Sequence, residues 1–288
     1  MQTLRAWGIV VVFLTVTLIG IPYQSAALCF GWKSAKTFPN TYHRWMAKLF
    51  GIKLTVIGTP VMDEGVLIVA NHTSWLDIII FSAIGRISFV AKAEVATWPL
   101  FSTLAKLQRT VFVDRTRRSA TGEVRDQIRD RLLAGDTLVL FPEGTSNDGN
   151  AVLPFKSALM GAVEARVEDG KGGTRAVKVQ PVSTAYTGLY GMPMGRENRA
   201  LFAWYGDMEL VPHLWEALLT GPIEVVVEFH KPLDVDQVGG RKALAALAEA
   251  TIRRGQARAL AGFIGPTPAI SAPAPVPATP RALASATA

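Results

Sequence analysis

Apolar and polar residues alternate in blocks along most of the chain. Short continuous apolar runs are typical of buried strands in a parallel sheet, whereas apolar residues at helical spacing indicate helices. We expect Ser74 to cap one helix and Gly135 to end another. The apolar runs predict strands at Leu54–Gly58, Gly65–Ala70, Ile87–Ala91, Thr110–Arg115, Asp136–Phe141, Ala176–Val182 and Ile223–His230. Helical spacing predicts helices at Trp75–Ile84, Thr121–Ala134, Ala158–Arg166 and Ala243–Leu260. This alternation predicts an α/β fold with a mostly parallel sheet flanked by helices.

The N-terminal region carries no charge between Arg5 and Lys33. Its most apolar part is Trp7–Ile21, and the run reaches the roughly 20 residues of a membrane span if it continues to Phe30. Basic residues follow this run at Lys33, Lys36, Arg44, Lys48 and Lys53. By the positive-inside rule, we expect the rest of the chain on the cytoplasmic face of the inner membrane.

Two alternatives remain for this apolar run. The small residues at 25–27 fit a cleaved signal peptide, and Pro22 fits a re-entrant hairpin. The next segment, Phe38–Phe50, mixes aromatic and basic residues and predicts an amphipathic helix. Such a helix lies either on the membrane interface or on the domain surface.

The division of the chain follows from these patterns. Residues 1–50 are expected to form a membrane anchor and an interfacial helix, and residues 51–262 a folded α/β domain. From 263 to 288 the sequence consists mainly of Pro and Ala with almost no charge, which predicts a disordered tail.

Composition and charge support a membrane-associated protein. Of 288 residues, 49% are hydrophobic and only 18% charged, and the net charge is +7. A basic chain fits an anionic membrane, an anionic ligand or nucleic acid, but no recognisable nucleic-acid module is present. Because Cys29 is the only cysteine, a disulfide within one chain and a cysteine-rich zinc site are excluded.

Polar residues follow three predicted strands at the point where each strand ends. His72, Arg115 and Glu143 all stand at or just beyond a carboxyl end. In parallel sheets, ligands bind at this edge. We therefore expect the three side chains to contribute to one site.

His72 and Asp77 have the chemistry of a general base and its orienting carboxylate. On one uninterrupted helix, residues five apart point about 140° away from each other, so the pair requires a junction between a loop and a helix. The pattern is weak by itself. Ser74 offers a competing nucleophile for a hydrolase, but it lacks a Gly-x-Ser-x-Gly elbow.

Two further segments add candidate binding residues. Arg115 is suited to holding a phosphate, and the alternative is a surface ion pair with Asp114 or Glu123. Gly144 allows close backbone approach after Glu143, although a plain turn has the same pattern.

The chain resembles the glycerolipid acyltransferases, most closely the bacterial 1-acylglycerol-3-phosphate acyltransferases. Four ordered motifs carry the resemblance, and together they are specific although each is weak alone. They are Asn71-His72-Thr73-Ser74-Trp75-Leu76-Asp77, Val111-Phe112-Val113-Asp114-Arg115, Phe141-Pro142-Glu143-Gly144-Thr145 and Val179-Gln180-Pro181-Val182. The matched region runs from about Leu54 to about Leu233.

The resemblance implies a reaction and its participants. His72 would act as general base on the acceptor hydroxyl, with Asp77 orienting it. The head group of a lysolipid would be bound by Arg115, Glu143, Gly144 and Thr145, and Pro181 would shape the acyl-donor side. The donor would be a thioester on acyl carrier protein or coenzyme A. No metal and no other cofactor are implied.

Two departures leave the acceptor open. The family often has Arg after Glu-Gly-Thr, whereas Ser146 stands here, and Lys156 is a candidate replacement. The tract 204–208, together with Pro212-His213-Leu214-Trp215, is similar to a bacterial branch that includes lyso-ornithine-lipid acyltransferases. The acceptor is therefore expected to be lysophosphatidate, lyso-ornithine lipid or both. A lysolipid-binding protein without catalysis and an esterase or lipase are the alternative functions.

Overall fold

The structure is a computed structural model that describes residues 2–62, 64–113, 120–164, 166–168 and 174–269. The strands are β1 (Ile52–Ile57), β2 (Val66–Ala70), β3 (Ile87–Lys92), β4 (Val111–Val113), β5 (Thr137–Leu140), β6 (Arg166–Glu168), β7 (Thr174–Ala176), β8 (Lys178–Leu189), β9 (Met192–Pro193) and β10 (Ile223–Phe229). The α-helices are α1 (Gln2–Cys29), α2 (Ser34–Leu49), α3 (Leu76–Ile84), α4 (Phe101–Leu107), α5 (Ala120–Leu133), α6 (Arg196–Arg199), α7 (Leu210–Thr220) and α8 (Arg241–Leu260). Two 3₁₀ helices are η1 (Ala93–Thr97) and η2 (Ser157–Glu164).

The main sheet has the strand order β1-β10-β8-β2-β5-β3-β4, and β9 pairs with β8. Neighbouring strands from β8 to β4 are parallel, as are β1 and β10. The junction between β8 and β10 is antiparallel. The predicted α/β fold with a mostly parallel sheet is confirmed. The carboxyl ends of β2, β5 and β3 come together at one edge, where α3, the segment after β5 and η1 begin.

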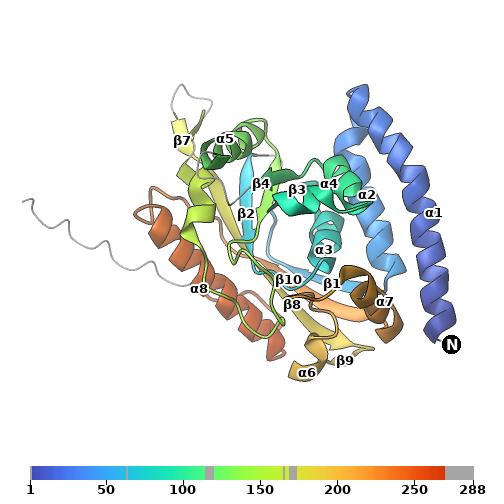
Figure 1. Ribbon diagram of the computed structural model, residues 1–288. Coiled ribbons are helices and arrows are strands. Elements are labelled where there is room, and N and C mark those ends of the chain that lie inside the picture. The colour runs from blue at the N-terminus through green and yellow to red at the C-terminus, as the bar shows by residue number, and fades with distance from the viewer. Residues whose placement is uncertain (1, 63, 114–119, 165, 169–173, 270–288) are drawn as a thin grey trace, which may run out of the picture.

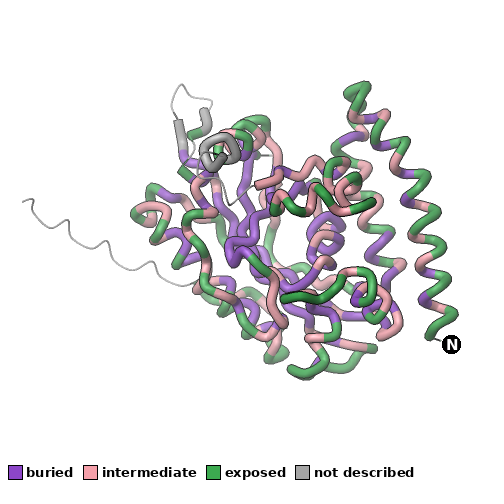
Figure 2. The backbone as a smooth tube through the Cα atoms, in the orientation of Figure 1, coloured by how far each residue is buried: buried purple, intermediate pink, exposed green. Residues whose placement is uncertain are grey.

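The central strand β2 shows how the sheet divides the molecule into layers. All five of its residues are buried, as a strand covered on both faces requires. Val66 and Ile68 belong to a core with α1, α2, α3 and α7, whereas Leu67 and Val69 belong to a core with α5 and α8. Figure 1 shows the blue and cyan N-terminal helices on one side of the sheet and α8 on the other. Figure 2 shows the buried residues concentrated along the sheet between these layers.

Helix α1 is one continuous helix that passes through Pro22, so the hairpin alternative is wrong. In the described part of the chain it alone is long and apolar enough to cross a membrane. Its buried residues recur every three to eight positions and form one stripe along the whole helix: Ala6, Ile9, Thr17, Gly20, Gln24 and Ala27. Arg5 donates to the carbonyl of Leu218 at 2.6 Å, and Gln24 donates to that of Leu107 at 3.1 Å. The helix therefore lies against the folded domain from end to end.

The amphipathic segment forms α2, which packs between α1 and α3. The Asn40 amide donates to the Ser82 carbonyl at 2.6 Å, and Met46 is buried at the interface. Trp45 remains 68% exposed on the outer side. One face of this helix therefore packs on the domain, and the opposite face leaves an aromatic side chain exposed.

Three local expectations differ from the structure. The predicted helix Ala158–Arg166 is the short 3₁₀ helix η2, because Gly161 weakens an α-helix and Met160 turns into the core. The strand predicted to end at Val182 continues to Leu189 as β8, since its polar residues are buried and paired between β2 and β10. Ser74 does not cap α3: its hydroxyl is buried without a hydrogen-bond partner.

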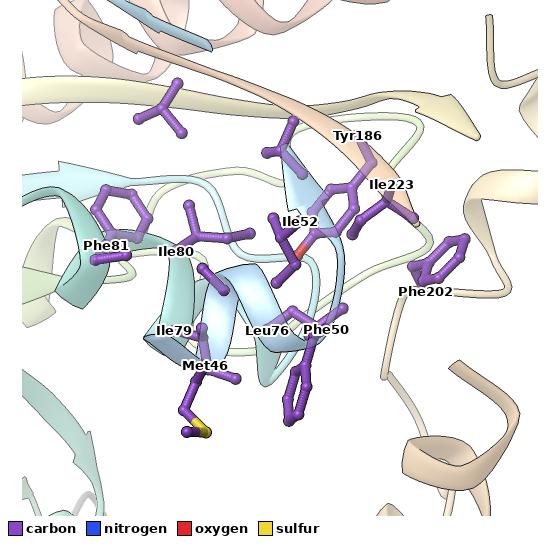
Figure 3. Packing of buried hydrophobic residues seen from close by; sticks show 14 of the residues in the cluster. Met46, Phe50, Ile52, Leu76, Ile79, Ile80, Phe81, Tyr186, Phe202 and Ile223 are labelled. Atoms are coloured by element: carbon purple, nitrogen blue, oxygen red, sulfur yellow. The ribbon is translucent and has the colours of Figure 1, made fainter. Parts of the chain in front are cut away.

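The core beneath α3 connects the sheet with the site. Figure 3 shows Tyr186 of β8 among Ile52, Ile223 and Leu76, with its ring inside the cluster. The ring is 1% exposed. The Tyr186 hydroxyl is the polar end of this apolar environment, and it donates a hydrogen bond to Asp77 in the first turn of α3.

Candidate active site

His72 and Asp77 are in direct contact across the junction between β2 and α3. The Nδ1–H of His72 donates to Oδ2 of Asp77 at 2.8 Å. Asp77 is fully buried, whereas the His72 side chain is 20% exposed. The junction brings together two residues that would diverge on one helix, as expected from the sequence. The contact leaves Nε2 of His72 as the nitrogen available to a substrate.

Asp77 is held by four donors. Besides His72, its Oδ2 accepts the backbone N–H groups of Thr73 and Ser74 at 2.8 and 3.0 Å. Its Oδ1 accepts the hydroxyl of Tyr186 at 2.9 Å. Burial, followed by the Asp77 charge and hydrogen bond, raises the pKa of Tyr186 well above its ordinary value, so this hydroxyl stays a donor. The carboxylate is therefore fixed in the orientation that sets the His72 tautomer.

Asn71 ends β2 and turns the chain out of the sheet. Its side chain donates to the carbonyl of Thr184 at 2.9 Å and accepts the Thr184 N–H at 2.8 Å. The side-chain amide of Asn71 thus takes the place of the backbone in hydrogen bonding to β8, one residue beyond the end of β2. This leaves the next residue, His72, free to leave the plane of the sheet.

Phe141 supports the imidazole ring of His72. The two rings are stacked with centroids 4.1 Å apart and an angle of 14°. Phe141 follows β5, which pairs in register with β2, so the parallel sheet places both residues at the same edge. Phe89 of β3 stacks on Phe141 in turn at 6.5 Å. Residues at the ends of β2 and β5 and within β3 thus fix the position of the His72 ring.

Glu143 is buried behind the loop that carries His72. Its Oε1 accepts the backbone N–H of His72 at 2.7 Å. Its Oε2 accepts the Asn147 side chain at 2.7 Å and the Leu153 N–H at 2.8 Å. Burial raises the pKa of Glu143 to about 7, although hydrogen bonds from Leu153 and His72 lower it. Both oxygens are engaged by the protein, so the structure gives Glu143 the surroundings of a positioning residue rather than those of a head-group ligand.

A cavity of about 720 Å³ opens from His72, a size typical of ligand sites. It runs between β3, α3 and the helices α1, α2 and α4. Most of its wall is apolar, including Phe13, Met46, Ile79 and Leu104. An apolar cavity that reaches the base is suited to an aliphatic chain whose reactive end lies at His72.

Only some of the other predicted site residues lie at the cavity. Gly144 and Thr145 line the cavity beside His72. Lys156 is exposed and Pro181 is buried within β8, and neither lines the cavity. Arg115, like Asp114 before it, lies outside the described residues, so its part in the site stays a prediction.

The segment 204–208 lines the cavity at its opening to solvent, where residues 206–208 are exposed. The N–H of Trp204 donates to the Thr73 carbonyl at 3.0 Å, and the Ser146 hydroxyl donates to the Trp204 carbonyl. The indole N–H of Trp204 donates to the carbonyl of Met208 at 2.8 Å, which closes a tight turn. The tract that departs from the commoner family pattern is therefore attached directly to the loop that carries His72.

Two functional residues were not found from the sequence. Tyr186 and Asn147 hold Asp77 and Glu143, but nothing near them in the sequence marks them. A strand prediction that continued beyond Val182 would have placed Tyr186 on the same face as Val182, which packs in the core under α3. The Ser74 hydroxyl, which a hydrolase would need, is buried and makes no hydrogen bond to His72.

Comparison with known proteins identifies the family. A family model described as acyltransferase matches residues 53–185. The chain is 47% identical over 255 residues to the lyso-ornithine lipid O-acyltransferase of Brucella abortus, covering 87% of this chain and 93% of that protein. The chain belongs to the acyltransferase family. His72, Asp77 and Glu143 all lie within the region that the acyltransferase model matches.

Two more relatives show the breadth of the acyltransferase family. The 1-acyl-sn-glycerol-3-phosphate acyltransferase of Neisseria gonorrhoeae is 30% identical over 199 residues, covering 68% of this chain and 72% of that protein. The crystal structure of the 1-acyl-sn-glycerophosphate acyltransferase from Thermotoga maritima has a TM-score of 0.60 and 24% identity, covering 88% of this chain and 96% of that one. The second likeness confirms the fold.

Proposed function

We propose that this acyltransferase moves a fatty acyl group from a thioester to the free hydroxyl of a lysolipid, with lyso-ornithine lipid as its principal acceptor. The observation that carries the reaction is the contact of His72 with buried Asp77 at the end of an apolar cavity. The acceptor rests on the Brucella relative, which matches over nearly its whole length. Lysophosphatidate, the acceptor in the name of more distant relatives, is the second candidate.

The chemistry follows from the tautomer of His72. With Nδ1–H engaged by Asp77, Nε2 takes the proton of the acceptor hydroxyl as its oxygen attacks the thioester carbonyl. The C–S bond of the resulting tetrahedral intermediate breaks, and the thiolate takes the proton back from His72. An ester and a free thiol are formed, and the enzyme returns to its starting state. Asp77 stabilises the imidazolium that exists between the two proton transfers.

The donor is a thioester of acyl carrier protein or coenzyme A. The cavity supplies the space for one long acyl chain, because its wall is apolar along α1, α2 and α4. Burial of each methylene contributes about 0.8 kcal/mol, so a long chain binds much more tightly than a short one. Comparing long and short acyl chains on each carrier measures this preference and shows which carrier is used.

The membrane contact is made by the outer face of α1. This face is apolar and exposed at Leu4, Trp7, Val11, Leu14 and Leu18. Because the opposite face packs on the domain along the whole helix, a transverse span would draw the domain into the roughly 30 Å hydrocarbon layer. We therefore propose that α1 lies along the cytoplasmic leaflet of the inner membrane.

The decisive experiment measures acyl transfer by purified protein in mixed micelles. Wild type is given an acyl thioester with lyso-ornithine lipid or lysophosphatidate, and the products are identified by mass spectrometry. His72→Ala should abolish ester formation with both acceptors while the protein accumulates and melts as wild type does. Full activity of His72→Ala would disprove the mechanism. Thioester hydrolysis without acceptor that is lost in Ser74→Ala would indicate an esterase, and lysolipid binding without product would indicate a binding protein.

A further inference from the structure

The mouth of the cavity carries charged side chains of both signs. Lys92 and Glu94 come from the end of β3 and the start of η1, and Asp207 comes from the turn 204–208. All three are exposed and line the cavity. Within the described part of the chain, none of the three side chains has an ion-pair partner. Three unpaired charges at the opening of an apolar cavity are available to a ligand.

The two segments that carry these charges are fixed to each other and to the catalytic loop. Trp98, just after η1, packs edge-to-face on Trp204 with ring centroids 5.7 Å apart. The backbone N–H of Trp204 donates a hydrogen bond to Thr73, the residue next to His72. The Trp204 indole N–H closes the turn that contains Asp207. Lys92 lies three positions after Phe89, which stacks on Phe141 beneath His72. The charges therefore surround the same opening that leads to the base.

The charge pattern suits an amino-acid head group. Ornithine whose α-nitrogen is acylated has one free carboxylate and one free side-chain ammonium, each at the end of a short arm. A phosphate monoester, in contrast, carries only negative charge and is repelled by carboxylates. Ser146, at the position where the family often has Arg, bonds to the Trp204 carbonyl instead of offering a cation. A site for a zwitterion needs both signs, and this opening has both.

We propose that Asp207, with Glu94 beside the opening, binds the ammonium of the acceptor head group and that Lys92 binds its carboxylate. The assignment deepens the proposed function and rests on it. Head-group binding at the opening holds the acceptor hydroxyl at His72 while the acyl chains occupy apolar surface. Specificity then arises from attraction of the zwitterion and from repulsion of a phosphate by the same carboxylates.

The test uses the full-length protein with Asp207→Asn and the matched variant Glu209→Gln. Glu209 is an exposed acid two residues away that does not line the cavity. Steady-state kinetics are measured with lyso-ornithine lipid, with the same lipid acetylated on its side-chain amine, and with lysophosphatidate. Asp207→Asn should raise KM for lyso-ornithine lipid about fivefold or more, the range of a partly desolvated ion pair, with kcat nearly unchanged.

Comparing KM among the three acceptors distinguishes a loss of head-group binding from misfolding of the variant. For the acetylated lipid, Asp207→Asn and wild type should have the same KM, because the ammonium is already absent. Lys92→Gln should raise KM for both ornithine lipids, and Glu209→Gln should change none of these values. Equal KM values of Asp207→Asn and Glu209→Gln for lyso-ornithine lipid would overturn the head-group assignment alone. A wild type that acylates lysophosphatidate but not lyso-ornithine lipid would overturn both the assignment and the proposed acceptor.

Discussion

The Glu143 carboxylate accepts the backbone N–H of His72 at 2.7 Å, so one predicted site residue supports another from behind. Sequence motifs place both at strand ends, and the resemblance assigns Glu143 to the acceptor head group. The structure instead surrounds Glu143 with His72, Asn147 and Leu153, which occupy both oxygens. These contacts make Glu143 a support of the loop that carries His72, which is the proposed base.

Glu143→Gln distinguishes these two roles. The amide cannot accept from both Asn147 and Leu153 while also accepting from His72, so the catalytic loop loses a charge-assisted bond. We expect kcat to fall about 10- to 100-fold, as follows from a loss of roughly 1.5–3 kcal/mol, with KM for the acceptor nearly constant. Steady-state kinetics measure both constants. A large rise in KM at unchanged kcat would instead support head-group binding.

The pH dependence of stability tests the burial of Glu143. Its folded-state pKa of about 7 is above the ordinary value of 4.5, so the folded protein holds the proton more tightly than the unfolded chain. Its contribution to stability is fully present below 4.5 and is lost as the pH rises through 7. We expect the free energy of unfolding of wild type to fall over this interval by up to about 3 kcal/mol relative to Glu143→Gln. A constant difference between the two proteins across denaturation curves at several pH values would contradict this.

Tyr186→Phe removes the donor to Oδ1 of Asp77. This leaves a buried carboxylate oxygen without a partner, and such a loss costs about 1–3 kcal/mol of stability. The His72 ring is then less well oriented, and we expect kcat to fall about tenfold while KM stays constant. Tyr190→Phe is the control, because Tyr190 is 51% exposed at the end of the same strand. If Tyr186→Phe retains full kcat, the remaining hydrogen bonds to Asp77 are sufficient to orient His72, and the prediction is wrong.

The membrane face of α1 is tested by a paired substitution. Val11 and Leu18 are 59% and 64% exposed on the face opposite the buried stripe. Changing both to Glu should move most of the protein from the membrane to the soluble fraction, because burial of a carboxylate in lipid is costly. Met192→Glu, at a residue that is 67% exposed on β9, should leave the distribution unchanged. Retention of the doubly substituted protein on membranes would show that another surface anchors it.

Much of the fold could be predicted because its signals are local. The apolar run of β2 and the break at Asn71 mark a buried strand and its end without any knowledge of the partner strands. The same is true of α1, which carries no charge from Ala6 to Cys29. Local patterns failed at η2, where helical spacing is present but packing favours a tighter turn, and at β8, where polar residues are buried by pairing.

The sequence by itself determined the order of the main strands and of helices α1, α2, α3, α5 and α8, and the placement of His72 just beyond a strand end. The helices α4 and α7 were not predicted. The sequence also placed Asp77 close enough to reach His72, because a strand-to-helix junction lies between them. Only the tertiary structure decided that Tyr186, 109 positions away, holds that carboxylate and that Glu143 faces inward. It also formed the cavity, whose walls come from α1, α2, α4 and the turn 204–208. These features depend on contacts between distant segments, for which no local pattern of residues carries a signal.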